Sequence, residues 1–584
     1  MREKIKNIPK FENIKELLYH SVSKYANNIA FTVKNKVGKE VKYIDYTYTK
    51  LLEDINSFGS SLYKLNLENK KVAIVGSNSY EWVISHLGVL LGGMVSVPLD
   101  KGLQLEELEN SLIRSEAEAI VFDEKLKDTI EEIKKANKTK IKNFICFTKQ
   151  DEYLDVHQLI EEGKKELDEG YTKYLDCKID SYKMSILLFT SGTTSKSKAV
   201  MLNQNGIATN IYDMQKVENF LPTDVNIAFL PYHHIFGSTG MLVMLASGMK
   251  TVFTDGLRYI KQNLVEYKVS LFVGVPVLID KMYSSIMKEI DKQGKTKLIN
   301  TAIKISNALR KVHIDLRKQL FKPINNALGG NMRFIISGGA PLDKKTAKWF
   351  NDVGILLVQG YGLTETSPVI AAENEKAIKY GSVGLPMEST TVKIENKDKE
   401  GIGEIVVKGP NVMLGYYQNE EQTNEVLKEN WFHTGDLGYL DKDGFLFITG
   451  RKKDLIVLKN GKKVFPEELE TLVNRLEEVE ESFVYGMPTE NNEDNIKVSV
   501  KVVYNEDVVK KKYGDIDPKE LYEIIWNKIK EINKTLPKYK YIKHMTITKE
   551  PLIKTTTNKI KRNEEMKKWK KLNNKFFQRR TLRL

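Results

Sequence analysis

The segment Phe189-Thr-Ser-Gly-Thr-Thr-Ser-Lys-Ser-Lys-Ala-Val200 directly follows the apolar run 186–189. It places hydroxyls, one glycine and two lysines where a buried strand would end. Backbone N–H groups and short hydroxyls can surround phosphate oxygens, glycine lets the backbone approach closely, and lysine supplies positive charge. The spacing excludes a Walker A loop, because Gly192 is not followed by Gly-Lys-Ser/Thr. Ordinary turns share this composition, so the loop predicts a phosphate site only together with other motifs.

Short apolar runs that end in Gly, Pro, Ser or Thr recur through the first two thirds of the chain. Helix-length segments separate them, which favours parallel strands buried on both faces of α/β sheets. Ligands of such sheets collect beyond the carboxyl ends of the strands. We therefore expect the loop after Phe189 to converge with Ser337-Gly-Gly-Ala-Pro341 and Gly360-Tyr-Gly362 on one crevice. The runs are 71–76, 186–192, 226–231, 271–276, 333–338 and 355–360.

The length of 584 residues is too great for one ordinary core, so two or more domains are expected. Residues 1–450 are predicted to form a large α/β domain of doubly wound sheets. Within it, residues 391–450 or so change to short alternating strands and glycine turns. The hairpin signal Asp441-Lys-Asp-Gly444 is typical of that texture, which predicts a β-rich subdomain.

Residues 451–584 are predicted to form a small, mobile C-terminal α+β lid domain. Pro466 should open a helix whose apolar face extends to Val479, and Asp517-Pro518 should cap a second helix. The segments 496–500 and 541–547 alternate between apolar and polar residues, as half-buried strands do.

Composition excludes several classes of protein. Cys146 and Cys177 are the only cysteines, which argues against a disulfide framework and fits a reducing cytosol. The first ten residues lack the apolar region of a secretory signal. Polar and glycine residues interrupt the apolar stretch 83–99, which is interpreted as a buried helix leading into a strand, not as a membrane span. We expect a cytoplasmic protein, and no recognition module predicts a nucleic-acid partner.

Much of the net charge of +14 lies in a basic tail, residues 566–584, which contains eight cations and no acid. A solvated, frayed tail is the favoured interpretation, since the segment shows no clean helical stripe. The alternative is peripheral contact with anionic lipid at the inner face of the membrane. Trp569, Phe576 and Phe577 would then act beside the basic side chains.

Four further motifs accompany the loop after Phe189. They are Gln359-Gly-Tyr-Gly-Leu-Thr-Glu-Thr366, Thr434-Gly-Asp-Leu437, Gly450-Arg-Lys-Lys-Asp454 and Pro551-Leu-Ile-Lys-Thr-Thr-Thr-Asn-Lys-Ile-Lys-Arg562. Their order and spacing closely resemble the adenylate-forming (AMP-binding) superfamily of acyl-CoA synthetases, luciferases and peptide-synthetase adenylation domains. The long-chain fatty acyl-CoA synthetases are the members that the chain resembles. The resemblance covers nearly the whole chain and implies ATP, Mg²⁺ and CoA as ligands.

The resemblance also implies roles for individual residues. Glu365 and Thr194 would hold Mg²⁺, and a carboxylate beside a phosphate loop is the hard oxygen ligand that this ion prefers. Tyr361 would pack on adenine and Thr364 would reach the α-phosphate, while Asp436 can accept hydrogen bonds from two ribose hydroxyls. The remaining cofactor-binding candidates are Thr190, Ser191, Gly192, Thr193, Lys198, Gly339, Ala340, Gln359, Gly360, Gly362, Arg451 and Gly461.

Lys559 matches the family lysine that bridges the acyl carboxylate and the phosphate, with Lys554 and Lys561 as fallback candidates. Asp454 occupies the family's hinge position, where backbone torsions change as the lid turns. That rotation would withdraw Lys559 and bring in 459–463, whose Gly461 could line a pantetheine tunnel.

His234 resembles the residue that lines the acyl pocket of these enzymes. Amino-acid-activating relatives place an aspartate near this position, whereas this chain offers uncharged neighbours such as Phe236, Met241 and Leu242. The small residues 337–340 would leave room for a tail. A medium- to long-chain fatty acid is therefore the expected substrate.

The chain departs from the family pattern at four positions. Ser195, Ser197 and Ala199 stand where relatives usually carry Gly, Pro and Gly, and Asn558 replaces a glycine. All four residues are small or compatible with turns. They put turnover and loop mobility in doubt more than nucleotide binding.

The predicted function is ATP-dependent activation of a fatty acid through acyl-AMP, followed by thioester formation with CoA. An acyl-[acyl carrier protein] synthetase or a fatty acyl-AMP ligase is the alternative, and a basic surface would suit an acidic carrier protein. A catalytically silent nucleotide-binding regulator is the alternative from another class. The joint presence of Glu365, Asp436, Arg451 and Lys559 speaks against it.

Overall fold

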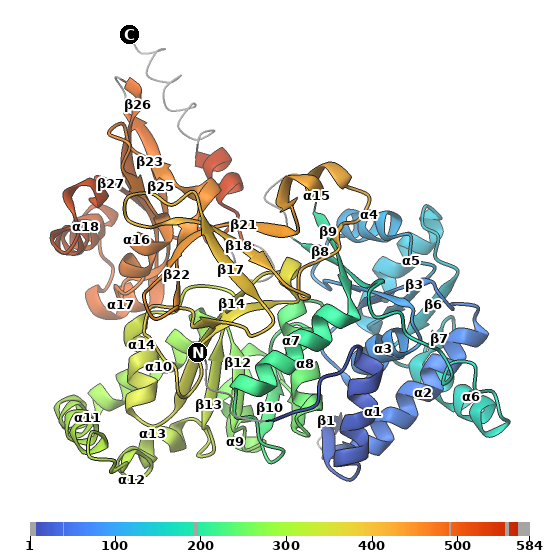
Figure 1. Ribbon diagram of the computed structural model, residues 1–584. Coiled ribbons are helices and arrows are strands. Elements are labelled where there is room, and N and C mark those ends of the chain that lie inside the picture. Colours follow the sequence, from blue (N-terminus) through green and yellow to red (C-terminus); the bar gives the residue numbers. More distant parts are fainter. Residues whose placement is uncertain (1–6, 39, 191–196, 490–491, 555–559, 570–584) are drawn as a thin grey trace.

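The computed structural model describes residues 7–38, 40–190, 197–489, 492–554 and 560–569 (Figure 1). The predictions for Ser191, Gly192, Thr193, Thr194 and Lys559 therefore concern residues outside the described ones. None of the helices in the described ranges combines the length and apolarity that a membrane span requires.

An eight-stranded sheet forms one half of the large N-terminal region. Its spatial order is β19 (Gly415–Tyr416), β9 (Lys198–Asn203), β8 (Met184–Thr190), β4 (Val95–Leu99), β3 (Lys71–Val75), β5 (Ala119–Phe122), β6 (Asn143–Cys146) and β7 (Leu154–Asp155). Strands β8 to β7 pair in parallel, whereas β9 pairs antiparallel with both β8 and β19. The hairpin β8–β9 carries the predicted phosphate loop.

A nine-stranded sheet forms the other half of this region. Its order is β16 (Leu385–Pro386), β15 (Val369–Ala372), β14 (Leu356–Gly362), β13 (Phe334–Ser337), β12 (Leu271–Gly274), β10 (Val225–Ala228), β11 (Lys250–Phe253), β1 (Ile29–Val37) and β2 (Glu40–Thr47). Strands β14 to β1 are parallel, and antiparallel β2, β15 and β16 lie at the two edges. Each of the six apolar runs predicted to be strands overlaps one, but they divide between two sheets.

Helices cover both sheets and fill the space between them (Figure 1). They are α1 (Ile14–Tyr25), α2 (Tyr48–Lys64), α3 (Tyr80–Leu91), α4 (Leu105–Ser115), α5 (Lys127–Ala136), α6 (Val156–Asp168), α7 (Gln204–Val217), α8 (Ile235–Ala246), α9 (Ile260–Glu266), α10 (Pro276–Lys292), α11 (Thr296–Arg310), α12 (Arg317–Leu320), α13 (Lys322–Ala327) and α14 (Lys344–Asp352). Helices α3 and α8 are apolar around most of their circumference and belong to one core that includes strands of both sheets. The segment 83–99 is a buried helix and a strand, as predicted.

A five-stranded antiparallel sheet follows within residues 391–451. Its strands are β17 (Thr391–Glu395), β18 (Gly403–Lys408), β20 (Leu427–Lys428), β21 (Trp431–Leu440) and β22 (Leu446–Arg451), with α15 (Glu420–Val426) beside them. The predicted hairpin joins β21 to β22. Asp441 accepts hydrogen bonds from the N–H groups of Asp443 and Phe445, and Gly444 adopts a φ of +84° that suits glycine.

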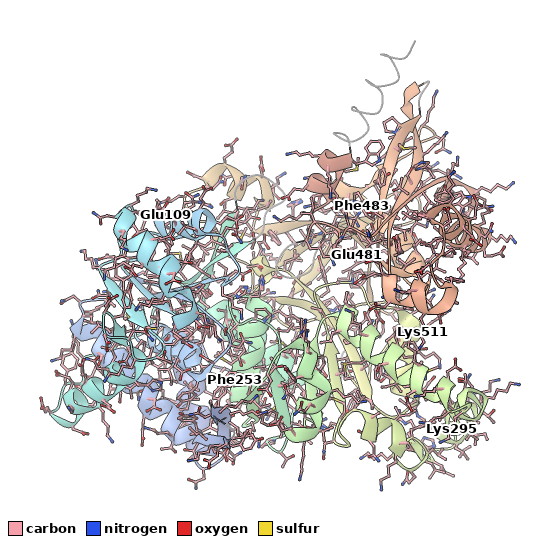
Figure 2. The ribbon with its side chains drawn as sticks, turned by 180° about the vertical axis from the view of Figure 1, so that it is seen from behind. Glu109, Phe253, Lys295, Glu481, Phe483 and Lys511 are labelled. Atoms are coloured by element: carbon pink, nitrogen blue, oxygen red, sulfur yellow. The ribbon has the colours of Figure 1, made fainter. Side chains whose placement is uncertain are left out.

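The C-terminal region is an α+β unit built on a three-stranded sheet. Its elements are β23 (Ile456–Val457), β24 (Lys463–Val464), α16 (Pro466–Val473), β25 (Val479–Thr489), β26 (Asn492–Tyr504), α17 (Glu506–Tyr513), α18 (Pro518–Lys534) and β27 (His544–Thr548). Figure 2 shows Glu481 and Phe483, both from β25, on this unit. Asp517 caps α18 as predicted, because its side chain accepts the N–H of Lys519. The boundaries 1–450 and 451–584 remain our proposal for the domain division.

The helix that Pro466 opens is shorter than predicted. It ends at Val473, and Val479 begins a strand. The reason lies at Glu478, which is fully buried and accepts hydrogen bonds from Lys512, Lys528 and the Tyr513 hydroxyl. These partners stabilise the buried carboxylate of Glu478. If the amphipathic helix had continued, the carboxylate would have lost them.

Candidate functional site

A cavity of about 1660 Å³ lies at the carboxyl ends of β8, β13 and β14, between the N-terminal sheets and the C-terminal unit. The predicted convergence of these strand ends is therefore confirmed. Apart from the fallback lysines, the described site candidates line the cavity: Thr190, Lys198, His234, Gly339, Ala340, Gln359, Gly360, Tyr361, Gly362, Thr364, Glu365, Asp436, Arg451, Asp454 and Gly461. The roles of the individual residues remain predictions.

Tyr361 and Asp436 form the most buried polar pair of the candidates that carry nucleotide-binding predictions. The Tyr361 hydroxyl donates to Asp436 Oδ2 over 2.7 Å, and Arg451 Nε lies 3.2 Å from Asp436 Oδ1. Asp436 and Arg451 are also opposite each other in the β21–β22 ladder. Burial raises the pKa of Tyr361, and the charge of Asp436 adds to this effect, so the phenol remains a donor.

The turn that carries Asp436 is held by Thr434. The Thr434 hydroxyl donates to the carbonyl of Ile405 over 2.7 Å and accepts the N–H of Asp436 over 3.0 Å. The carboxylate is therefore fixed by its own backbone as well as by its side-chain partners. A carboxylate fixed in this way is suited to bind two adjacent hydroxyls.

Glu365 lies beside a tyrosine that the sequence analysis missed. The Tyr416 hydroxyl donates to Glu365 Oε1 over 3.0 Å, and Lys198 Nζ lies 4.4 Å from the centre of the Tyr416 ring. Burial raises the pKa of Tyr416, and Glu365 raises it further. One aromatic ring thus spaces a lysine from a carboxylate at the wall of the cavity. A carboxylate in this position fits a Mg²⁺ ligand, and the lysine fits a phosphate partner. Nothing in the local sequence 415–417 indicated this contact.

Arg114 of α4 anchors the C-terminal side of the phosphate loop and was also missed. Its guanidinium donates to Ser197 Oγ over 3.0 Å and to the Ser197 carbonyl over 2.8 Å. It also lies 5.2 Å from the centre of the Phe189 ring, which precedes the loop. Arg114 thus contacts both sides of the predicted phosphate loop, at Phe189 and at Ser197. The chain order gave no signal, because 83 residues separate the two partners.

Two glycines of the cavity wall are required by geometry. A Cβ on Gly362 would lie 1.9 Å from the carbonyl oxygen of Pro368, so no side chain fits there. Gly339 has a φ of +83°, and a Cβ on it would meet only Val275 at 3.9 Å. A residue with a side chain would be strained at this positive φ. The open space beside Gly339 also lets a ligand approach the backbone.

One wall of the cavity is apolar. Its members include Met214, Val217, Phe220, Leu230, Ile235, Phe236, Val275, Val277, Leu342 and Val369. Of the uncharged neighbours of His234 named from the sequence, Phe236 lines the cavity, whereas Met241 and Leu242 are 2% and 1% exposed and belong to the core. Glu218, a buried acid that the sequence analysis did not consider, also lines the cavity.

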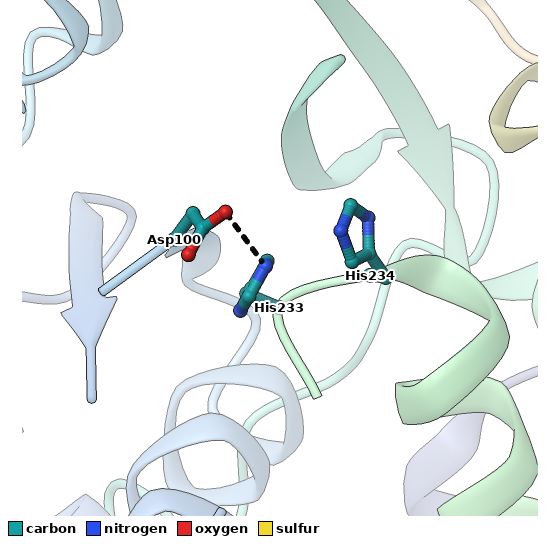
Figure 3. A group of neighbouring side chains, drawn as sticks. All are labelled: Asp100, His233 and His234. Atoms are coloured by element: carbon teal, nitrogen blue, oxygen red, sulfur yellow. Dashed lines mark ion pairs between the residues drawn. The ribbon is translucent and has the colours of Figure 1, made fainter. Parts of the chain in front are cut away.

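His234 lies at the start of α8, next to His233 and Asp100 (Figure 3). The ring centres of the two histidines are 4.4 Å apart, and His233 Nε2 lies 3.4 Å from Asp100 Oδ2. One potential ligand atom of each residue lies within 4.8 Å of the others. Imidazole and carboxylate are ligand types that Zn²⁺ accepts, so these three residues could hold a metal ion. Asp100 follows β4, and its place at a strand end was the signal that could have indicated it.

On the C-terminal side, the hinge candidate Asp454 contacts a largely buried arginine, Arg562. Arg562 Nε lies 3.6 Å from Asp454 Oδ2, and the same guanidinium pairs with Glu470 and donates to the carbonyl of Val484 over 3.2 Å. Burial raises the pKa of the adjacent Glu467 to about 7. Arg562 thereby connects the segment that follows Lys559 in sequence to the hinge candidate Asp454.

The two fallback candidates for the catalytic lysine are engaged elsewhere. Lys554 pairs with Glu481, and Lys561 pairs with Glu564 over 3.2 Å. Neither residue lines the cavity, whereas Ile560 and Arg562 do. This arrangement favours Lys559 among the three, although Lys559 itself lies outside the described residues.

Ion pairs connect the C-terminal unit to the rest of the chain. Arg475 and Asp343 form a two-armed pair with distances of 2.6 Å and 2.9 Å. Lys463 Nζ lies 2.9 Å from Asp398 of the five-stranded region. Both pairs cross the proposed domain boundary at the rim of the cavity, so they stabilise the orientation seen here.

The cavity lies between two sheets, a β-rich region and a small C-terminal unit. It combines an apolar wall with cations and hydroxyls. This combination defines the class of nucleotide-using acid-activating enzymes. Family models agree with this class. Residues 18–417 match the model of the AMP-binding enzyme, and residues 453–581 match the AMP-binding enzyme C-terminal domain. The chain belongs to the AMP-binding enzyme family.

Curated relatives and solved structures give the same picture. Long-chain-fatty-acid–CoA ligase FadD15 of Mycobacterium bovis is 28% identical over 76% of this chain and 76% of its own length. Long-chain-fatty-acid–[acyl-carrier-protein] ligase AEE15, chloroplastic, of Arabidopsis thaliana is 27% identical over 85% of this chain and 78% of its own. The crystal structure of the anthranilate CoA ligase AuaEII in complex with anthranoyl-AMP aligns with a TM-score of 0.75, at 20% identity, over 96% of this chain and 98% of that chain. At this identity the structural likeness shows the fold alone.

Proposed function

We propose that the protein is an AMP-forming fatty acid–CoA ligase. One observation carries this proposal: a single cavity joins an apolar wall to the Tyr361–Asp436 pair and to Glu365 with Lys198. The apolar wall suits an alkyl tail, and the polar part suits a nucleotide. The names of the curated relatives support the same reaction.

In the first step the acid carboxylate attacks the α-phosphorus of ATP, giving acyl-AMP and pyrophosphate. Both reactants are anions, so the protein must mainly position them and neutralise charge. Lys198 contributes that charge from the loop, and Lys559 is proposed to contribute it from the C-terminal segment. Glu365 and Thr194 are the residues proposed to hold Mg²⁺, which would neutralise phosphate charge when bound. Asp436 and Tyr361 orient the nucleoside.

In the second step a thiol attacks the acyl carbon and AMP leaves. We propose that the C-terminal unit turns about Asp454 between the steps, so that one cavity serves both reactions. Gly461 already lines the cavity with a φ of +75°, and a Cβ on it would meet no atom within 4 Å. There is therefore space beside its backbone for a narrow chain such as pantetheine.

Separate half-reactions test this division of labour. Lys559→Ala should abolish acyl-AMP formation but spare thioester formation from supplied acyl-AMP. Equal loss in both half-reactions would contradict the assignment. Asp454→Pro should block turnover with CoA, since proline fixes φ at the hinge, and normal turnover would show that the hinge lies elsewhere.

We propose a medium- to long-chain fatty acid as the substrate, because the wall around Phe236 and Val275 is apolar. Each buried methylene contributes about 0.8 kcal/mol, so kcat/KM should rise steeply with chain length until the wall is covered. Pyrophosphate release from a series between acetate and palmitate measures this. Amino and aryl acids belong in the same panel, because the buried Glu218 could instead bind an ammonium group.

An acyl carrier protein is the second candidate for the thiol acceptor. The 27% identity to a chloroplastic acyl-carrier-protein ligase is the observation that favours it. Offering CoA and a carrier protein separately, with the same acid, distinguishes the two acceptors. Acid-dependent pyrophosphate release without transfer to either one would indicate a fatty acyl-AMP ligase, and no release with any acid would indicate a nucleotide-binding regulator.

A further inference from the structure

The helical segment 295–322 carries an exposed surface that the proposed reaction does not use. Six of the exposed large apolar side chains among the described residues lie within it: Leu298, Ile305, Val312, Ile314, Leu316 and Leu320. Leu298, Ile305 and Val312 are 64%, 54% and 63% exposed. A cluster of this kind marks an interaction site more often than isolated exposed residues do.

Helix α11 packs against the rest of the molecule through one face, the inner face, and leaves other residues exposed. Ile299, Ala302 and Ile303 pack against the core that α10 and α14 share, and Ser306 is fully buried. Leu298 and Ile305 are seven residues apart and therefore share one exposed face, which lies beside the inner face. Helix α11 is thus anchored by one apolar stripe and presents a second stripe to the outside.

Lysines accompany this second stripe in register. Lys297, Lys304 and Lys311 each directly precede one of the three apolar residues and are exposed. Within residues 295–322 there are eight Lys and Arg residues and one acid, Asp315, which pairs with Arg317 over 2.6 Å. The segment therefore carries +7, half of the chain's net charge of +14.

The composition identifies the kind of partner. Lysine is depleted at the centres of protein–protein interfaces. At a bilayer surface, by contrast, lysine extends its charge to the headgroups while aliphatic side chains enter the acyl boundary. Positive charge beside the apolar residues specifically favours anionic lipid. Trp569 of the basic tail packs instead against Tyr485, with ring centres 5.4 Å apart.

We propose that the outer face of α11 and α12, residues 295–322, binds anionic membrane lipid. Lys295 lies at the outer edge of the molecule, as a membrane-facing surface requires (Figure 2). Helix α10 begins at the apolar wall of the cavity with Pro276 and Val277 and packs against α11. The surface therefore lies one helix away from the wall, where an acid leaving a bilayer could arrive. The proposal goes beyond the proposed function and does not depend on it.

Vesicle co-sedimentation of the full chain tests the proposal without any activity measurement. Wild-type protein should bind vesicles of phosphatidylcholine mixed with phosphatidylglycerol and leave phosphatidylcholine vesicles unbound, with weaker binding at high salt. The triple variant Lys297→Glu, Lys304→Glu, Lys311→Glu should lower binding by on the order of 100-fold. The triple variant Leu298→Ser, Ile305→Ser, Val312→Ser should also lower it.

A matched control carries the same charge change elsewhere: Lys164→Glu, Lys165→Glu and Lys178→Glu, which are exposed residues in and after α6. This variant should bind as the wild type does. Equal loss in both lysine triples would overturn the proposal, since net charge alone would then explain binding. If charge reversal of the cations in 570–584 abolished vesicle binding while the α11 variants bound normally, the tail would be the membrane-binding segment and the proposal would be wrong. If the wild type formed a dimer that the α11 variants dissociated, and vesicle binding did not change, the surface would bind a second copy of the chain and not lipid.

Discussion

Removal of the Arg114 side chain tests whether the phosphate loop is positioned from α4. Arg114→Ala deletes two hydrogen bonds to Ser197, of 3.0 Å and 2.8 Å, and a ring contact with Phe189. Hydrogen bonds from charged groups are worth about 1.5–3 kcal/mol when buried. Arg114 is half-buried, so about 1 kcal/mol for each bond is appropriate. The total of about 2 kcal/mol corresponds to roughly a 30-fold loss.

The loss should appear in kcat/KM for ATP in acid-dependent pyrophosphate release. The free energy of unfolding should fall by no more than the same ~2 kcal/mol, because both bonds are present in the folded enzyme. Arg114→Lys should give an intermediate value, since one ammonium cannot reproduce the two-armed contact. Arg258→Ala, at an exposed position, is the control and should match the wild type.

A double-mutant cycle with Ser197→Pro makes the reasoning refutable. Proline is the residue that relatives usually carry at this position, and its ring fixes φ at residue 197. Proline also lacks the Oγ that accepts one of the two bonds from Arg114, so Arg114→Ala should cost less than about fivefold in that background. The reasoning is refuted if Arg114→Ala stays within twofold of the wild type, or if its cost is equal in both backgrounds.

Four other predictions concern the same cavity and its rim. Tyr361→Phe removes the hydroxyl that donates to the Asp436 carboxylate and should weaken AMP binding about tenfold by calorimetry. Glu365→Gln should lower Mg²⁺-dependent ATP use more than about tenfold while AMP affinity changes little. Arg475→Ala removes the pair with Asp343, worth about 1 kcal/mol, and should speed tryptic cleavage near residue 453 about fivefold. Glu467→Gln should flatten the fall of unfolding free energy between pH 5 and 7, measured by guanidinium titration.

The sign of the pH prediction follows from burial of Glu467, which raises its pKa from the ordinary 4.5 to about 7. The native state binds more protons than the unfolded state in this interval, so the free energy of unfolding falls as pH rises. The contribution is about 1–3 kcal/mol, present below the interval and lost above it. A slope unchanged by Glu467→Gln would show that other groups govern the dependence.

Each of the other three predictions also has a contradicting result. Unchanged AMP affinity in Tyr361→Phe would show that the contact is structural only. Parallel losses of ATP use and AMP binding in Glu365→Gln would place the metal elsewhere. Equal cleavage rates in Arg475→Ala and the wild type would mean that the ion pair does not hold the C-terminal unit.

Local chemistry let the sequence by itself determine much of this protein. Buried parallel strands must be apolar and must end in turns, so runs such as 71–76 and 333–338 marked strands correctly. The turn at Asp441 and the cap at Asp517 rest on bonds within a few residues. The candidates between Thr190 and Gly461 that the structure describes were recognised because their motifs are contiguous in the chain.

The tertiary structure alone decided how distant segments meet. It divided the strands between two sheets, and the apolar helices α3 and α8 belong to a core that includes strands of both. It placed Arg114 on Ser197 and Tyr416 on Glu365, pairs separated by 83 and 51 residues. It also moved Met241 into the core and left Leu298 exposed, although both are apolar. Composition and periodicity describe one element at a time, whereas burial depends on which face of each element packs against the others.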